Sequence, residues 1–309
     1  MNSQQLSTSA QISAKKRMEF WATLLLIGVT FVWGFTFVTT QNLLQEMQAA
    51  DMQVWRFGIA FAVMFAINPK ALINLPRHHK KHGIYLGTTL GIGYLFQLAG
   101  LTQTSATVSG FITGLFVVFT PILAGLILKE PIEKTAWFAV LLTTVGLGFI
   151  ALNGWSMGVG EILTLACAFF FSLHIIGLDK WSKTDYVYGL TAMQILVVFI
   201  FNLIAAEIGG GIASPPNKHA LGAISFLAVV GTCIGYFAQT WVQSSIGPTR
   251  TAIILTMEPV FAGIAGVTIG TDVLTKRIVI GAILILIGTY VVELGPRHSA
   301  EGTHPHLEP

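Results

Sequence analysis

The sequence feature that most constrains this chain is an uncharged run at 83–128, which contains no Asp, Glu, Lys or Arg. A polar stretch at 102–105 divides the run into two apolar pieces of about 20 residues, the length that an α-helix needs to cross about 30 Å of hydrocarbon. Such surfaces would aggregate in water, whereas in lipid a helix satisfies its own backbone hydrogen bonds. Similar uncharged runs lie at 20–45, 135–160, 220–249 and 278–292. The sequence therefore predicts an all-α integral membrane protein.

The composition agrees with a membrane protein. Charged residues make up 10% of the chain, whereas soluble domains carry about 25%. The two cysteines, Cys167 and Cys233, lie inside apolar segments, and two cysteines exclude a disulfide framework. We find no cofactor or metal motif and predict neither, and with a net charge of +3 we expect no nucleic-acid partner.

Length and charge interruption divide the chain into about ten membrane spans. They lie at 20–40, 52–68, 83–101, 106–128, 135–152, 161–180, 186–206, 219–241, 249–269 and 276–293. The loops between them are short, which leaves no room for a soluble domain. We expect the polar segment at 1–14 to be disordered.

Basic residues follow every second span, and this pattern predicts the orientation of the protein in the membrane. They are Lys15, Lys16, Arg17, Lys70, Arg77, Lys80, Lys81, Lys129, Lys134, Lys180 and Lys183. The intervening loops at 41–51, 102–105 and 153–160 contain no Lys or Arg. We therefore predict that both termini are cytoplasmic, in a protein of the inner membrane. Lys276 and Arg277 depart from the pattern, but downstream charges weigh less in setting topology.

The two halves of the chain carry a matching motif. Residues 121–125 and 259–263 both read Pro, two apolar residues, Ala and Gly, and each following span has a late glycine, Gly146 or Gly288. This match predicts that the first five spans are repeated in the last five, and because five is odd the second set must enter the membrane upside down. Inverted repeats are typical of secondary transporters, whose binding site lies between the halves near the midplane.

At these residues the chain resembles the drug/metabolite transporter superfamily, of the EamA type. The matching pieces are WGFTFV, the Arg-Phe of QVWRFGIAF, TGLFVVFTPILAGLILKEP, GEILTLACAFFFSLHII and LTMEPVFAGIAG. The resemblance implies ten helices in two EamA repeats at 20–152 and 153–294, flanked by cytoplasmic segments at 1–19 and 295–309. It also implies export or exchange of small metabolites. Family members usually carry Gly-Glu after the ninth span, where this chain has Gly270, Thr271 and Asp272.

Glu258 is the residue that is hardest to explain structurally. It lies about eight residues into the ninth span, which is about 12 Å deep at the rise of an α-helix. A carboxylate in lipid is unfavourable, so it should face a cavity, find a partner or be protonated. It would then couple transport to protons or bind a substrate amine. The structural alternative is a protonated glutamate that makes one interhelical hydrogen bond.

Two further polar residues lie within spans. Arg56 lies about one turn inside the second span, where it would either reach the outer surface or Asp51, or hold a substrate carboxylate. His174 lies close to Asp179 and Lys180 in the sequence, and we expect an interfacial histidine there rather than a proton relay.

We predict a central cavity between the repeats, lined by the first, third, fourth, sixth, eighth and ninth spans. The predicted substrate-binding residues are Trp33, Tyr94, Gln97, Tyr236, Gln239 and Arg56. Aromatic and amide groups with few charges suit a small neutral or zwitterionic, amino-acid-like solute. A phosphorylated substrate would need several Arg or Lys residues. Each polar group could instead make an ordinary interhelical hydrogen bond.

Pro121 and Pro259 occupy matching places in the two repeats. Proline removes a helical hydrogen bond and kinks a helix. The two kinks would act as hinges for alternating access, or would simply bend their helices.

Other functions fit the sequence less well. An intramembrane protease needs paired aspartates, a Ser-His dyad or an HExxH helix, and a channel needs a filter loop or a charged ring. We find none of these, and no P-loop for ATP. The expected partners are therefore a small-molecule substrate, lipid and protons. The favoured function is a secondary metabolite exporter, and a multidrug exporter of the same fold is the alternative.

Overall fold

The computed structural model describes residues 3–128, 134–153, 156–182, 185–246, 254–255 and 257–294. The basic loop residues Lys129 and Lys183 and the predicted cytoplasmic tail at 295–309 lie outside the described residues. Within the described part the only strands are β1 (Leu152–Asn153) and β2 (Ser156–Met157), which pair antiparallel between the two halves of the chain.

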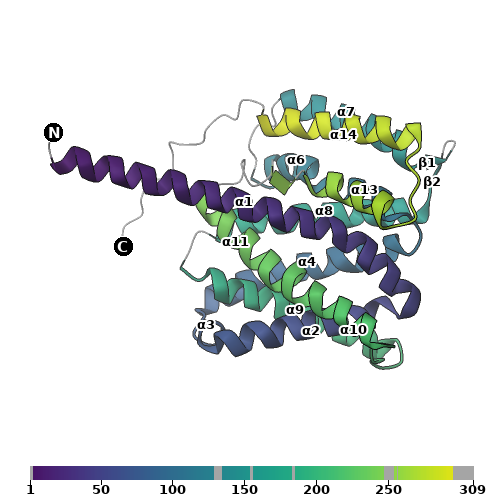
Figure 1. The fold of residues 1–309 in the computed structure, drawn as a ribbon, viewed down its shortest axis with the longest axis horizontal. Helices are drawn as coiled ribbons and strands as arrows, with labels where there is room; N and C mark the ends of the chain where they lie inside the picture. Colours follow the sequence, from purple (N-terminus) through teal and green to yellow (C-terminus); the bar gives the residue numbers. More distant parts are fainter. Residues whose placement is uncertain are drawn as a thin grey trace.

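The chain is otherwise helical. The first half contains α1 (Ser3–Glu46), α2 (Ala49–Ile67), α3 (Pro69–Ile73), α4 (Arg77–Leu101), α5 (Ala106–Thr113), α6 (Phe116–Leu128) and α7 (Lys134–Ala151). The second half contains α8 (Val159–Trp181), α9 (Val187–Ile208), α10 (Lys218–Phe226), the π-helical η1 (Leu227–Ile234), α11 (Gly235–Ile246), α13 (Met257–Thr268) and α14 (Lys276–Leu294). Figure 1 shows these helices side by side in one bundle.

Among the described residues, seven helical segments are long and apolar enough to cross a membrane. The shorter apolar helices Trp137–Ile150 and Met257–Thr268, together with α14, occupy the remaining predicted positions. The prediction of an all-α, multi-pass membrane protein with about ten spans is therefore confirmed.

The prediction of disorder at 1–14 is wrong, because α1 already begins at Ser3. This segment contains no glycine or proline and includes the good helix formers Gln4, Gln5, Leu6, Ala10, Gln11 and Ala14. Extending an existing helix requires no new nucleus, so the membrane span continues as helix into the polar segment. Figure 1 shows the resulting extension of α1 beyond the bundle.

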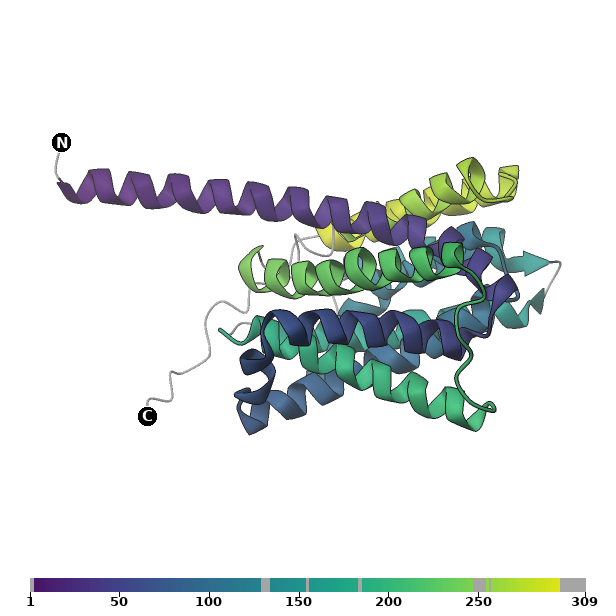
Figure 2. The same cartoon turned by 60° about the horizontal axis from the view of Figure 1, so that its bottom comes forward.

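Two predicted spans are interrupted helices. The fourth span breaks between α5 and α6 at Gly114 and Leu115, and the eighth runs from α10 through η1 into α11. Figure 2 shows this eighth span lying alongside α1 and α2. Single π-helical turns within α-helices occur frequently at functional sites, because they redirect backbone carbonyls.

Residues from both halves of the chain accept hydrogen bonds from the free backbone amides at the start of helix α5. Ser105 caps it by accepting a 3.2 Å hydrogen bond from the Val108 N–H, and the Asp272 carboxylate accepts one of 2.7 Å from the Thr107 N–H. A carboxylate here satisfies a free amide and complements the helix dipole. The resemblance described above implies Gly-Glu in this segment, where the chain has Gly270, Thr271 and Asp272, and Asp272 supplies a carboxylate at this end of α5.

The helices of the two halves pack in matched pairs. The second and seventh spans contact each other as α2 and α9, and the fifth and tenth as α7 and α14. The contact of α1 with α13 has its counterpart in α8 with α6, and that of α4 with α9 in η1 with α2. This is the pattern expected when a two-fold axis exchanges the first five spans with the last five.

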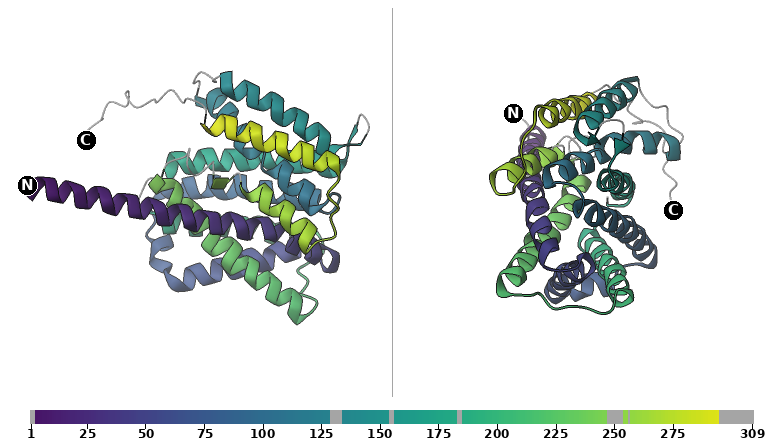
Figure 3. Two further views of the ribbon diagram at one scale, coloured as in Figure 1. Left: turned by 45° about the horizontal axis from the view of Figure 1, so that its top comes forward. Right: turned by 90° about the vertical axis from the view of Figure 1, so that its right-hand side faces the viewer.

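The α7–α14 pair forms one edge of the bundle, as the views in Figure 3 show. The two helices cross closely at Gly146 and Gly281, where an added Cβ on either glycine would lie within about 3 Å of the other's carbonyl oxygen. Such close crossing is the usual role of small residues in membrane helices. The remaining spans surround the centre of the bundle, where the polar residues are found.

Candidate functional site

A cavity of about 600 Å³, including its open mouth, lies between the two halves of the chain. The structure brings all seven predicted binding and coupling residues to its wall: Trp33, Arg56, Tyr94, Gln97, Tyr236, Gln239 and Glu258. Each of the six spans expected to line it contributes at least one residue, and α2 adds Arg56. More than half of the residues in the cavity wall are aromatic or apolar, among them Phe116, Phe171 and Leu255.

Arg56 is buried in the cavity wall, with only 2% of its surface exposed. Its Nε donates to Thr232 Oγ1 at 2.9 Å, and one terminal nitrogen donates to Tyr94 Oη at 3.2 Å. The guanidinium also lies over the Tyr94 ring, 5.1 Å from its centroid. The expectation that Arg56 reaches the outer surface or Asp51 is therefore wrong, because neutral groups deep in the bundle bind its guanidinium instead.

Thr232 binds Arg56 because of the π-helical turn. Its hydroxyl donates to the Leu227 carbonyl, five residues earlier, at 2.9 Å, so its oxygen is left to accept from Arg56. Nothing in the amino-acid pattern of 227–234 indicates a π-helix, and the sequence therefore gave no signal for this contact.

The two predicted tyrosines meet across the cavity. Tyr94 on α4 and Tyr236 on α11 share a hydrogen bond of 2.6 Å between their hydroxyls. Since the Tyr94 oxygen already accepts from Arg56, the guanidinium, Tyr94 and Tyr236 form one hydrogen-bonded chain from the first half to the second. Charged members make such chains stronger than isolated neutral hydrogen bonds.

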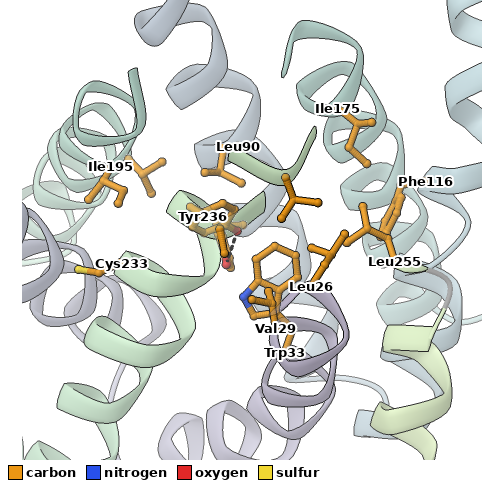
Figure 4. Close-up of a cluster of buried hydrophobic side chains, with 14 of the residues drawn as sticks. Leu26, Val29, Trp33, Leu90, Phe116, Ile175, Ile195, Cys233, Tyr236 and Leu255 are labelled. Carbon is orange, nitrogen blue, oxygen red and sulfur yellow. Dashed lines mark hydrogen bonds between the residues drawn. The ribbon is translucent and has the colours of Figure 1, made fainter. Parts of the chain in front are cut away.

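Trp33 lies against Tyr236, with their ring centroids 5.3 Å apart, as Figure 4 shows. Its indole N–H donates to the Gly231 carbonyl at 2.8 Å. Gly235 allows this approach, because a Cβ there would lie 2.6 Å from Trp33 Nε1. The ring therefore forms a fixed aromatic wall of the cavity.

Glu258 faces the cavity from α13 and is 7% exposed. Within the described part of the chain, no hydrogen bond or ion pair engages its carboxylate. The matching position in the first half is Thr120, which donates its hydroxyl to the Phe116 carbonyl at 2.6 Å. At this position the first half therefore has a hydroxyl that bonds within its own helix, and the second half has a carboxylate without a described partner.

Two cavity glutamines differ in their partners. The Gln97 amide donates to Thr113 Oγ1 at 3.5 Å, and Oε1 of Gln239 is buried without a partner among the described residues. An unpaired buried amide oxygen is unfavourable, which is consistent with a binding role for Gln239.

His174 is a cavity residue that the sequence reasoning missed. It is 2% exposed, lines the cavity and bonds to Gln194 on α9, so the expectation of an interfacial histidine is wrong. The interfacial position was expected because the charged residues Asp179 and Lys180 lie further along α8. The rotation of α8 about its axis nevertheless turns His174 toward the cavity.

The two candidate hinge prolines lie on helices beside the cavity. Pro121 is inside α6, and Pro259 packs against Gly114 at the break between α5 and α6. Their function as hinges remains a prediction.

Comparison with known proteins gives a consistent result. The model of the EamA-like transporter family matches residues 20–152 and 158–294. A protein of Archaeoglobus fulgidus named "Uncharacterized transporter" is 31% identical over 89% of this chain and 86% of its own length. "Uncharacterized transporter YyaM" of Bacillus subtilis is 25% identical over 86% of this chain and 91% of its own.

A solved crystal structure has the same fold. It superposes with a TM-score of 0.66 at 16% identity, over 88% of this chain and 96% of that chain. At this identity the likeness concerns the fold alone.

Proposed function

The chain belongs to the EamA-like transporter family and is a multi-pass membrane transporter, and from this premise we propose that it exports small zwitterionic solutes resembling amino acids. The proposal places the protein in the cytoplasmic membrane with both termini in the cytoplasm. Transport would proceed by alternating access, with the solute bound in the cavity between the repeats.

One observation carries the proposal, which is the distribution of charge in the cavity wall. The first half contributes Arg56, whose charge is balanced by no described carboxylate, and the second half contributes Glu258, which has no described partner. A solute with a carboxylate and an ammonium group would complement both. Since unpaired buried charges are strongly unfavourable, such a solute would stabilise the site more than a neutral one would.

The cavity also supports a role for protons. Glu258 can hold either a proton or an ammonium group, but not both at once. Competition between the two would couple solute release to proton uptake. Pro121 and Pro259 would permit the opposite bending of the halves that alternating access requires.

A multidrug exporter of the same fold is the alternative, because aromatic rings form much of the cavity wall. An exporter of lipophilic cations would be hindered by the buried Arg56, since a like charge in a low-dielectric wall repels the solute. The dependence of transport on Arg56 therefore separates the two functions.

The test uses the purified full-length protein in proteoliposomes loaded with the standard L-amino acids. We expect saturable efflux with counterflow that responds to pH. Arg56→Gln should abolish it, and Glu258→Gln should lower it strongly and remove the pH response. Glu161→Gln is the matched control, because Glu161 bonds to Thr104 at 2.7 Å outside the cavity.

Efflux of lipophilic cations that persists in Arg56→Gln, without amino-acid efflux in the wild type, would favour the multidrug exporter. An unchanged pH profile in Glu258→Gln would return Glu258 to a structural role.

A further inference from the structure

His174 lies in the same cavity as Glu258, on the wall formed by the second half of the chain. It is buried in α8, and its ring packs edge-on against Tyr236 with centroids 6.1 Å apart. The sequence gave it no role in binding, and the charge distribution of Arg56 and Glu258 does not require it. Any role in binding depends on which ring nitrogen carries the proton and which can accept a hydrogen bond.

A chain of hydrogen bonds from Thr240 through Gln194 determines the tautomer of His174. The Thr240 hydroxyl donates to the Tyr236 carbonyl at 2.7 Å, so its oxygen can only accept from Gln194, 3.4 Å away. The Gln194 amide must therefore turn its NH2 group toward Thr240 and its oxygen toward His174. That oxygen lies 2.7 Å from His174 Nε2, which must carry the proton to donate.

In a neutral imidazole one nitrogen donates and the other accepts. With Nε2 fixed as the donor, Nδ1 of His174 carries the lone pair. Among the described residues nothing donates to Nδ1, and it is not one of the fully buried atoms that lack a partner. Since His174 lines the cavity and Gln194 engages Nε2, Nδ1 is the ring nitrogen that can accept a hydrogen bond from a solute.

We propose that His174 Nδ1 accepts a hydrogen bond from the ammonium group of the transported solute, in the cavity that the Glu258 carboxylate also lines. Gln194 and Thr240 are positioning residues that hold the required tautomer. This inference rests on the proposed function and sharpens it, because it makes the site selective for solutes with an N–H donor. The first half then binds the carboxylate and the second half binds the amine.

The inference is tested by measuring binding to the purified full-length protein with isothermal titration. The probes are the standard L-amino acids, each paired with the carboxylic acid that lacks only the amine, such as leucine with 4-methylpentanoate. His174→Phe keeps an aromatic ring against Tyr236 but removes both ring nitrogens, the Nδ1 acceptor among them. We expect it to reduce the preference for the amino acid about tenfold, the size expected for a hydrogen bond to a charged group. Affinity for the deaminated acid should stay unchanged.

Two further variants separate binding from packing. His174→Asn places an amide oxygen where Nδ1 lies and should restore most of the preference. Gln194→Leu removes the acceptor that keeps the proton on His174 Nε2 and should reduce the preference for the amino acid several-fold. This variant tests the inference if His174→Phe does not fold. Gln243→Leu is the control, because Gln243 makes a buried 3.2 Å bond to the Ile175 carbonyl of the same helix but does not line the cavity.

Equal losses for amino acids and deaminated acids in His174→Phe, or no loss for either, would overturn the role of His174 while leaving the proposed function standing. Binding of no amino acid by the wild-type protein would overturn the proposed function itself, and this inference with it.

Discussion

At the scale of single residues, the cavity depends on hydrogen bonds that extend from one half of the chain to the other. Tyr94 is the central member, because its hydroxyl contacts both Arg56 and Tyr236 while its ring packs edge-on against Phe57 and Phe171. The hydroxyl therefore has an electrostatic role and the ring a packing role. Replacing tyrosine by phenylalanine separates the two.

We predict that Tyr94→Phe weakens binding of the zwitterionic solute about tenfold, because Arg56 loses one of its two described hydrogen-bond acceptors and is no longer held in place. The protein should remain folded, since the ring contacts are kept. Titration of the purified variant with the standard L-amino acids measures the affinity. Tyr85→Phe on the same helix, where the side chain is 39% exposed, should bind as the wild type does. Equal affinity in Tyr94→Phe and the wild type would show that the hydroxyl does not position Arg56.

At the scale of the elements, close helix crossings set the position of the cavity wall. Helix α1 carries Trp33, and its neighbour Gly34 lies against the α13 backbone that leads from Glu258. A Cβ at Gly34 would lie 2.7 Å from the Ala262 nitrogen, which cannot move without separating the two helices. Gly28, two turns earlier on the same helix, has open space around it.

We therefore predict opposite effects for two identical substitutions on α1. Gly34→Ala should destabilise the protein by about 1–3 kcal/mol through overpacking and should lower transport. Gly28→Ala should be neutral or stabilising by up to about 1 kcal/mol, because alanine favours the helix over glycine. Thermal unfolding of both purified variants in detergent compares them directly. Equal midpoints would show that α1 and α13 can separate freely.

At the scale of the whole molecule, the start of α1 and the end of α14 mark one side of the protein. The start of α1 and the end of α14 lie toward the same end of the bundle, as Figure 1 shows. The short helix α3, which contains Lys70, and the start of α4, which contains Lys80 and Lys81, lie at that end too. Their charge predicts that this end faces the cytoplasm.

Thiol labelling of intact cells tests this orientation. In a protein whose buried Cys167 and Cys233 are replaced by alanine, a cysteine at the exposed Asn42 should react with an impermeant reagent from outside. A cysteine at the exposed Asn74 should react only after the cells are opened. Asn74 is a better site than His79, which is buried and would be unreactive on either side of the membrane. Labelling of Asn74 alone in intact cells would reverse the topology.

The sequence by itself determined the membrane class, the approximate spans and the repeat. These properties depend on length, charge and the order of residues along one helix, because lipid imposes the same requirement on every span. The polar residues of the cavity could be named for the same reason. A residue such as Glu258 or Arg56 is unfavourable in lipid wherever its helix lies, so its presence alone indicates a protected environment.

Only the tertiary structure decided which partners those residues have. Arg56 bonds to Thr232 because a π-helical turn presents that hydroxyl, and His174 faces the cavity because the packing of α8 against α4, α5 and α6 sets its direction. Arg56 and Thr232 lie 176 residues apart in the chain, whereas His174 and Gln194 lie on the consecutive helices α8 and α9. The distances of both contacts depend on the rotation of each helix about its axis. In spans that are apolar on all sides, a rotation of about half a turn would leave the hydrophobic pattern nearly unchanged. The sequence pattern therefore does not determine how each helix is rotated.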